Sequence, residues 1–135
     1  MKTFSTWVAD HHFISQQDDQ RISMDGALKQ GVGPKALLLS GLAGCSGIDV
    51  VDILEKMRVA FTRFEVSAEA EQTDEHPRVF TTIQLVYQID VSATETDKVK
   101  KAIELSLEKY CGVAAMLRKN SPIEYRLELI GSVSA

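Results

Sequence analysis

Two segments in the middle of the chain alternate apolar and polar residues, the pattern of a strand with one buried face. They are residues 61–73 and residues 79–91, and the stretch between them contains the turn-forming residues Asp74–Pro77. We therefore predict a long antiparallel hairpin over about residues 61–91. The same alternation near the end of the chain predicts a last strand over about residues 122–131. The apolar positions of the first segment are Phe64, Val66, Ala68 and Ala70.

The segment before the hairpin has a helical pattern instead. Pro34 suits the first position of a helix, where its missing N–H costs nothing, and the pattern predicts a central helix over about residues 34–58. Apolar side chains occupy every face of this helix as far as Ile48, so we expect its first half to be buried in the centre of the fold or of a dimer. Close approach by another backbone would compensate for the low helix propensity of its glycines. These glycines are Gly41, Gly44 and Gly47.

The remaining elements complete an α+β arrangement. Short mixed segments predict a meander of strands over about residues 1–25. Ser92–Glu95 has the pattern of a capping box, which opens helices over about residues 94–119. Strands that cluster, rather than alternate strictly with helices, favour an α+β fold with antiparallel sheets. The length is ordinary for one domain, so we expect a single domain over residues 1–135.

The charge and hydropathy of the chain argue against several classes of partner. The chain has 19 acidic and 15 basic residues, a formal net charge of −4, and no block of like charge. Nucleic acid is not an expected partner, because phosphate binding needs a basic patch. Polar residues interrupt any signal sequence at the N-terminus, and the apolar window 37–54 contains Asp49 and Asp52, which a membrane penalises. We expect a cytoplasmic protein without a membrane span.

Cys45 and Cys111 are the residues best suited to chemistry. Two cysteines in a reducing compartment are more often free thiols or a redox pair than a structural bridge. Cys45 stands within the predicted central helix, where a structural packing role is an open alternative. Cys111 stands where one helix ends and another begins, so free N–H groups and Lys109 favour a thiolate, although packing or capping would also explain it. Sequence spacing leaves open whether the two sulfurs meet.

Other polar residues predict less. His11 and His12 are neighbours and point to opposite faces of a strand, and His76 lies beside a turn proline, so we expect no metal site. Asp49 and Asp52 fit a solvated helix face better than a pair of acid–base groups. The chain contains no glycine-rich nucleotide loop and no nucleophile elbow, so nucleotide and serine hydrolase chemistry lack support.

Three stretches of the sequence resemble the OsmC/Ohr family of osmotically inducible and organic hydroperoxide resistance proteins. Residues 33–45, which begin with Gly-Pro and end at Cys45, are similar to the start of the central helix of that family. Residues 108–114 match the place of its second cysteine, here Cys111, and residues 77–80 are also similar. Together the matches span most of the chain, and the residues around both cysteines are most similar to the YhfA-like branch.

The resemblance implies an OsmC-like fold, in which two chains form an intertwined homodimer with long buried central helices and active sites at the subunit interface. It also implies a thiol-dependent peroxidase that reduces organic hydroperoxides in oxidative-stress defence. The cysteine matching Cys45 attacks the peroxide and becomes a sulfenic acid, and the one matching Cys111 resolves it as a disulfide. A dithiol reductant such as a lipoylated protein then reduces the disulfide. The resemblance implies no bound metal, haem or flavin.

The groups that would stabilise the reactive thiolate differ from the family pattern. In the hydroperoxide-resistance branch, a glutamate ahead of the first cysteine holds an activating arginine, and the same offset before Cys45 here is Lys35. The N-terminal strand region offers Arg21 as the arginine. Lys35 and Arg21 are therefore the candidate thiolate stabilisers. The missing pair favours an alternative function, a non-catalytic OsmC-fold dimer that binds an apolar or thiol-containing small molecule or senses redox state.

Overall fold

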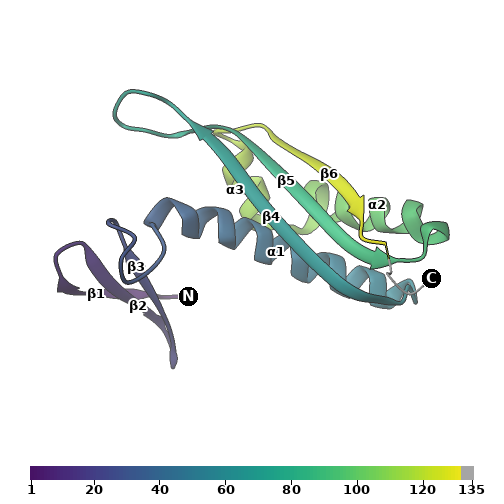
Figure 1. Ribbon diagram of the computed structural model, residues 1–135, viewed down its shortest axis with the longest axis horizontal. Coiled ribbons are helices and arrows are strands. Elements are labelled where there is room, and N and C mark those ends of the chain that lie inside the picture. Colours follow the sequence, from purple (N-terminus) through teal and green to yellow (C-terminus); the bar gives the residue numbers. More distant parts are fainter. Residues whose placement is uncertain (132–135) are drawn as a thin grey trace. The chain divides into compact units, whose positions relative to one another are not determined.

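The chain forms two compact units in the computed structural model, which describes residues 1–131 (Figure 1). The first unit comprises Met1–Leu38, and the second begins at Leu39. The boundary falls within the first turns of helix α1 (Pro34–Lys56), which begins at the proline that the sequence indicates. The expectation of one domain over the whole chain stays a prediction.

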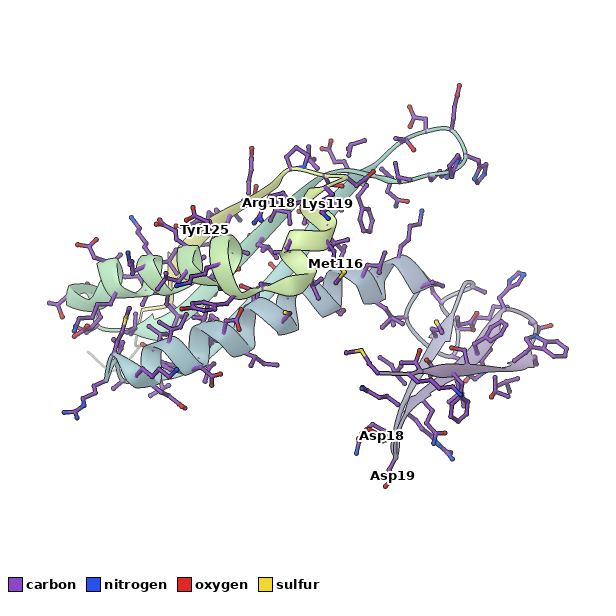
Figure 2. The ribbon with its side chains drawn as sticks, turned by 180° about the vertical axis from the view of Figure 1, so that it is seen from behind. Asp18, Asp19, Met116, Arg118, Lys119 and Tyr125 are labelled. Atoms are coloured by element: carbon purple, nitrogen blue, oxygen red, sulfur yellow. The ribbon has the colours of Figure 1, made fainter. Side chains whose placement is uncertain are left out.

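The first unit is a meander of three antiparallel strands in the order β1-β2-β3. Asp10 and Asp18 form its turns with φ of 47° and 50°, a left-handed conformation that aspartate tolerates better than most residues. Asp18 and Asp19 lie at the tip between the second and third strands (Figure 2). The strands are β1 (Phe4–Ala9), β2 (His12–Gln17) and β3 (Gln20–Asp25).

The connection that follows β3 is organised by the buried side chain of Asp25. Its two carboxylate oxygens accept hydrogen bonds from the backbone N–H groups of Ala27 and Gln30, at 2.8 and 3.0 Å. The bond from Ala27 is the main reason that the pKa of Asp25 lies below its usual value. A Cβ at Gly31 would overlap the backbone of Ser23, so this connection requires glycine there.

The second unit contains a three-stranded sheet in the order β4-β5-β6. β4 (Phe61–Gln72) and β5 (Phe80–Val91) form the expected antiparallel hairpin, but β6 (Ile123–Leu129) runs parallel to β5. The prediction of purely antiparallel sheets is therefore wrong for this strand. A parallel pair needs a crossover connection, and the helices between residues 93 and 118 provide it. The alternating pattern correctly predicts a strand at β6, but such a pattern does not specify the direction of the strand.

Helices cover one face of this sheet and form the core with it (Figure 1). Four residues of the central strand β5 point into the core, and residues of α1 and α2 (Thr96–Leu105) pack among them. The β5 residues are Ile83, Leu85, Tyr87 and Ile89, and the α2 residues are Val99, Ala102 and Ile103. The structure therefore has the α+β composition that the sequence indicates.

Helix α1 buries one face and leaves much of its remaining surface exposed in the single chain. The buried positions recur every four residues, which places them on one side of the helix. Ile48 is 66% exposed, so burial on every face, which the apolar sequence predicts, does not occur within one chain. The buried positions are Leu42, Ser46, Val50 and Leu54.

Among the described residues, α1 is the one helix whose length and hydropathy match a membrane span. The core helix of a soluble protein passes the same test. Because α1 packs Leu42, Val50 and Leu54 into the core and carries Asp49 within its apolar window, its composition fits a core helix.

The crossover from β5 to β6 contains two short turns besides its α-helices. The predicted capping box does not form, because the Ser92 hydroxyl pairs with Thr94 and the chain enters a 3-10 turn, η1 (Ala93–Glu95), before α2. A π-helical turn, η2 (Ser106–Tyr110), follows α2 and leads to α3 (Gly112–Arg118). The guanidinium of Arg118 donates a hydrogen bond to the carbonyl of Leu107, which ties α3 back to η2 (Figure 2).

Candidate functional site

The two cysteines lie together in the second unit. Cys45 is half-buried on α1, and Cys111 is 3% exposed between η2 and α3. Both are free thiols, and the Cys45 side chain lies close enough to Cys111 to act on the pKa of its thiol. The structure therefore brings into one neighbourhood two cysteines whose proximity the sequence spacing left open.

Backbone geometry fixes Cys111 at the break between two helical segments. Its N–H donates to the carbonyl of Ser106 at 2.7 Å, a five-residue step that closes the π-helical turn. Its backbone is extended, with φ −77° and ψ 103°, and its sulfur accepts a hydrogen bond from Ala114 N–H at 3.4 Å. Cys111 therefore acts as the N-cap of α3.

The surroundings of Cys111 favour its thiol over its thiolate. Burial raises the pKa of Cys111 to about 11, and the Cys45 side chain and the charge of Asp49 act in the same direction. The N–H of Ala114 opposes them and is outweighed. The expectation of a stabilised thiolate at this helix break is therefore wrong in its net effect. The ammonium group of Lys109 lies over the Tyr110 ring, 5.2 Å from its centre.

The two candidate cations belong to the first unit. Arg21 is exposed on β3, and Lys35 is in the first turn of α1. Their role as stabilisers of the Cys45 thiolate stays a prediction.

A network of buried and half-buried polar groups lies beside the cysteines, and no pattern in the sequence indicates most of it. The hydroxyl oxygens of Ser46 and Tyr87 are 2.6 Å apart, and those of Ser46 and Ser106 are 2.8 Å apart. Ser106 also donates to a carboxylate oxygen of Asp49 at 3.0 Å. Burial raises the pKa of Tyr87 to about 12, so the phenol keeps its proton. Asp49 is thus a partner in an internal network rather than a purely solvated residue.

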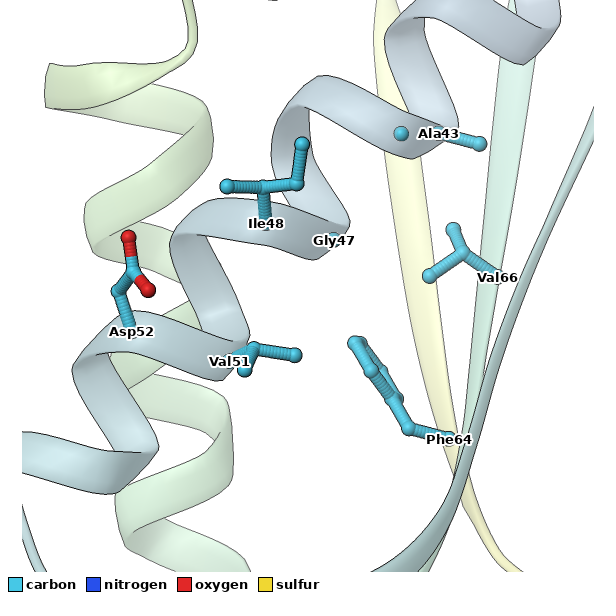
Figure 3. Close-up of a pocket in the computed structure, with 8 residues that line it drawn as sticks. Ala43, Gly47, Ile48, Val51, Asp52, Phe64 and Val66 are labelled. Carbon is cyan, nitrogen blue, oxygen red and sulfur yellow. The ribbon is translucent and has the colours of Figure 1, made fainter.

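Two hollows adjoin α1 in the second unit. One, of about 420 Å³, lies between α1 and β4, and its wall is mainly apolar (Figure 3). Its lining includes Gly47, Ile48 and Val51 from the helix and Phe64 and Val66 from the strand. The second, of about 520 Å³, combines carboxylates with apolar groups. It is lined by Asp49, Asp52, Ile53, Lys56, Met57, Leu105 and Tyr110.

The histidines take no part in this region. His12 lies within the first unit, where its Nε2 atom is 2.7 Å from the Ser23 hydroxyl. Within residues 1–131 no three side chains of histidine, cysteine, aspartate or glutamate gather as a metal site would require.

Known proteins are similar to this chain in both sequence and fold. The family model described as OsmC-like protein matches residues 26–126. Protein YhfA of Escherichia coli strain K12 is 35% identical over 128 residues, which cover 93% of this chain and 96% of that protein. The proximity of the two cysteines follows from the structure of this chain and does not depend on these matches.

Solved structures of lower sequence identity have the same fold. An OsmC-like protein from Mycoplasma pneumoniae is 20% identical, with a TM-score of 0.84 and coverage of 96% of both chains. The organic hydroperoxide resistance protein OhrB of Bacillus subtilis is 16% identical, with a TM-score of 0.68 and coverage of 94% of this chain and 96% of that one. These structures show the fold, and the family model over residues 26–126 together with the 35% identity to YhfA shows that the chain belongs to the OsmC-like protein family.

Proposed function

We propose that this protein is a thiol-dependent peroxidase that reduces organic hydroperoxides, with Cys45 as the attacking cysteine and Cys111 as the resolving cysteine. The observation that carries the proposal is the proximity of the two free thiols, since the Cys45 side chain acts on the pKa of Cys111. Two neighbouring cysteines outside any structural bridge are the minimum that a peroxide-reducing dithiol requires.

The different surroundings of the two thiols support this assignment of roles. Cys45 is the more accessible of the two, as an attacking sulfur must be. Cys111 is buried, and its pKa of about 11 keeps it protonated at neutral pH. A protonated thiol is a poor first nucleophile, because peroxides react with the thiolate. The Cys111 thiol is therefore suited to react second, after a sulfenic acid has formed on Cys45.

The reaction then proceeds in three balanced steps. The Cys45 thiolate attacks one oxygen of the hydroperoxide, so that an S–O bond forms, the O–O bond breaks and the alkoxide leaves as an alcohol after taking a proton. The Cys111 sulfur attacks the Cys45 sulfenic acid, so that the S–S bond forms and hydroxide leaves as water with the Cys111 proton. A dithiol such as a lipoyl group then exchanges with the disulfide and restores both thiols.

The apolar hollow between α1 and β4 supports an organic substrate (Figure 3). Gly44, which directly precedes Cys45, contributes to its wall together with Ile48 and Phe64. An apolar wall next to the residue that precedes Cys45 favours alkyl or fatty-acid hydroperoxides over hydrogen peroxide. The name of the Bacillus subtilis structure, an organic hydroperoxide resistance protein, agrees with this substrate class.

The proposal includes a cytoplasmic homodimer in which the exposed faces of α1 are covered by the partner, and thiolate stabilisation by Lys35 or Arg21. The exposed side chain of Ile48 supports the dimer, because an apolar helix face rarely stays in water. A reducing cytoplasm agrees with two free thiols.

The alternative function is a dimer that binds an apolar or thiol-containing small molecule without turnover. The hollow of about 420 Å³ favours it, since this size suits a small apolar ligand. In this case the cysteines serve as packing residues or as slow redox sensors.

The test is consumption of cumene hydroperoxide with excess dithiol by the intact protein, Cys45→Ser and Cys111→Ser. Mass spectrometry follows the loss of two hydrogens that marks an internal disulfide. Catalytic consumption that Cys45→Ser abolishes would support the peroxidase. If all three proteins match the background rate of the dithiol alone, the peroxidase proposal is wrong and the binding function gains support.

A further inference from the structure

Four hydrogen-bonded groups take no part in the three steps above, and we call them the hydroxyl chain: the buried hydroxyls of Tyr87, Ser46 and Ser106, and the half-buried carboxylate of Asp49. We propose that the hydroxyl chain holds Cys111 against Cys45 for disulfide closure, so that Ser46 and Ser106 are positioning residues of the resolving step. This inference rests in part on the proposed function, because the resolving step belongs to it.

The hydroxyl chain links the two segments that carry the cysteines. Ser46 directly follows Cys45 on α1, and Ser106 begins the π-helical turn that ends beside Cys111. The carbonyl of Ser106 accepts the Cys111 N–H at 2.7 Å, and its hydroxyl lies 2.8 Å from that of Ser46. One hydrogen bond between side chains therefore connects the immediate neighbour of one cysteine to the backbone anchor of the other.

Every hydroxyl of the hydroxyl chain has a partner within it. The Ser106 hydroxyl donates toward both the Ser46 hydroxyl and the Asp49 carboxylate, which only accepts. The Ser46 and Tyr87 hydroxyls share a further hydrogen bond in which either can donate. A fully satisfied buried network of this kind specifies a single arrangement of the elements that it joins.

Packing alone does not require these groups. Ser46 and Ser106 are both 0% exposed at a contact between α1 and η2 where alanine would also fit. The ring of Tyr87 is already held by aromatic neighbours, at 6.4 Å from Phe64 and 5.9 Å from Tyr125 between ring centres. The phenol oxygen thus contributes a hydrogen bond, whereas the aromatic neighbours determine the position of the ring. Removing single oxygen atoms therefore separates the hydrogen bonds from the packing.

The π-helical turn supplies a second reason. The bond from Cys111 N–H to Ser106 spans five residues, where an α-helix would span four. Such turns are less stable than α-helix and persist when their surroundings hold them. The bonds from Ser106 to Ser46 and Asp49 provide such a hold at the first residue of the turn.

The first experiment measures the equilibrium between the dithiol and disulfide forms of the protein in mixtures of reduced and oxidised dithiothreitol. It needs no peroxidase activity. We expect Ser106→Ala and Ser46→Ala to lower the effective concentration of the two thiols toward each other by roughly three- to tenfold, the weight of one lost hydrogen bond. Ser121→Ala is the matched control, because Ser121 is also buried but donates to the carbonyl of Phe80. It should leave this equilibrium unchanged.

The second experiment separates the two oxidation steps with limiting cumene hydroperoxide and dimedone, which traps sulfenic acid. In the intact protein, the Cys45–Cys111 disulfide should form faster than dimedone reacts with the sulfenic acid. In Ser106→Ala the yield of dimedone adduct on Cys45 should rise by a similar factor, while the rate of the first oxidation stays the same. Tyr87→Phe should act in the same direction, and Tyr125→Phe, which loses only a bond to Glu104, should not.

The outcomes distinguish this inference from the proposed function. If Ser106→Ala and Tyr87→Phe behave as Ser121→Ala and Tyr125→Phe do in the dithiothreitol equilibrium, the hydroxyl chain is only structural and the inference is wrong. If hydroperoxide never oxidises Cys45 but the equilibrium shifts as expected, the peroxidase proposal fails and the positioning role stands. Tyr87→Phe keeps the inference testable if a serine variant does not fold.

Discussion

The two cysteine segments show how differently one chain can hold the same side chain. Cys45 stands inside a regular helix, and its place follows from a repeat in which every fourth residue of α1 is buried. Cys111 stands at a break, between a π-helical turn and a short helix, and depends on contacts with residues far away in the sequence. The first environment gives access and the second gives burial. The proposed order of reaction, with Cys45 first and Cys111 second, depends on this difference.

Exchange of each cysteine for serine should have the largest effect on oxidation, and it tests whether the two cysteines have different roles. We expect Cys45→Ser to abolish oxidation by cumene hydroperoxide, because the buried Cys111 thiol does not react first. Cys111→Ser should keep the first oxidation within about twofold of the intact rate and accumulate a sulfenic acid. Rapid mixing followed by dimedone trapping and mass spectrometry measures both. Loss of the first oxidation in Cys111→Ser alone would reverse the assigned roles.

A buried residue of the helix that carries Cys45 should matter more for stability than an exposed residue of the helix that follows Cys111. Leu42→Ala removes a fully buried side chain three residues before Cys45, and it should lower the free energy of unfolding by about 2–5 kcal/mol. Met116→Ala, on α3 beyond Cys111, is the matched control because Met116 is 66% exposed. It should change the stability by about 0.5 kcal/mol or less. Urea unfolding at one protein concentration compares them, and equal losses would contradict the packing described for α1.

Alkaline pH should destabilise the protein through Cys111. The pKa of this thiol rises from 9.0 to about 11 on folding, so above pH 9 the unfolded chain releases a proton that the folded chain keeps. The contribution to stability is complete below pH 9 and is lost between about pH 9 and 11. Cys111→Ser should make the fall in stability over this range smaller by about 1–3 kcal/mol. Tyr87 titrates above this range, at about 12, and remains in both proteins. Identical pH profiles of urea unfolding would contradict the raised pKa.

Lys109→Ala should have the smallest effect. The ammonium group of Lys109 interacts with the ring of Tyr110 rather than with the Cys111 sulfur. The rate at which iodoacetamide alkylates Cys111 in a Cys45→Ser background should therefore change by less than about twofold. A large decrease would show that Lys109 supports the thiolate after all, as its position in the sequence suggests.

The elements of the fold are visible in the sequence to the extent that they depend on local patterns. Alternation locates the β4–β5 hairpin, and Pro34 marks the start of α1. The parallel direction of β6 is not visible, because a strand of alternating residues has the same pattern in either direction. The capping box predicted at Ser92 is also wrong, because a local pattern does not exclude competing partners. The Ser92 hydroxyl forms its hydrogen bond with the Thr94 hydroxyl instead.

The candidate site divides in the same way. Cys45 and Cys111 stand out by residue type, and only the fold shows that they are neighbours. Tyr87 occupies an apolar-face position of an alternating strand, and serines such as Ser46 and Ser106 are common throughout the chain. The hydroxyl chain joins positions 41 and 60 residues apart, so no local pattern contains it. The signal that was available is the adjacency of Ser46 to Cys45.

The π-helical turn before Cys111 also sets a length. An α-helix rotates by about 100° for each residue, so a turn with one residue fewer would carry the following side chain around the helix axis by roughly that angle. The same cysteine would then face away from Cys45, although its type and its neighbours in the sequence were unchanged. The spacing from Ser106 to Cys111 therefore determines the direction in which the Cys111 sulfur points, and a deletion within Ser106–Tyr110 would separate the two sulfurs as effectively as replacing one of them.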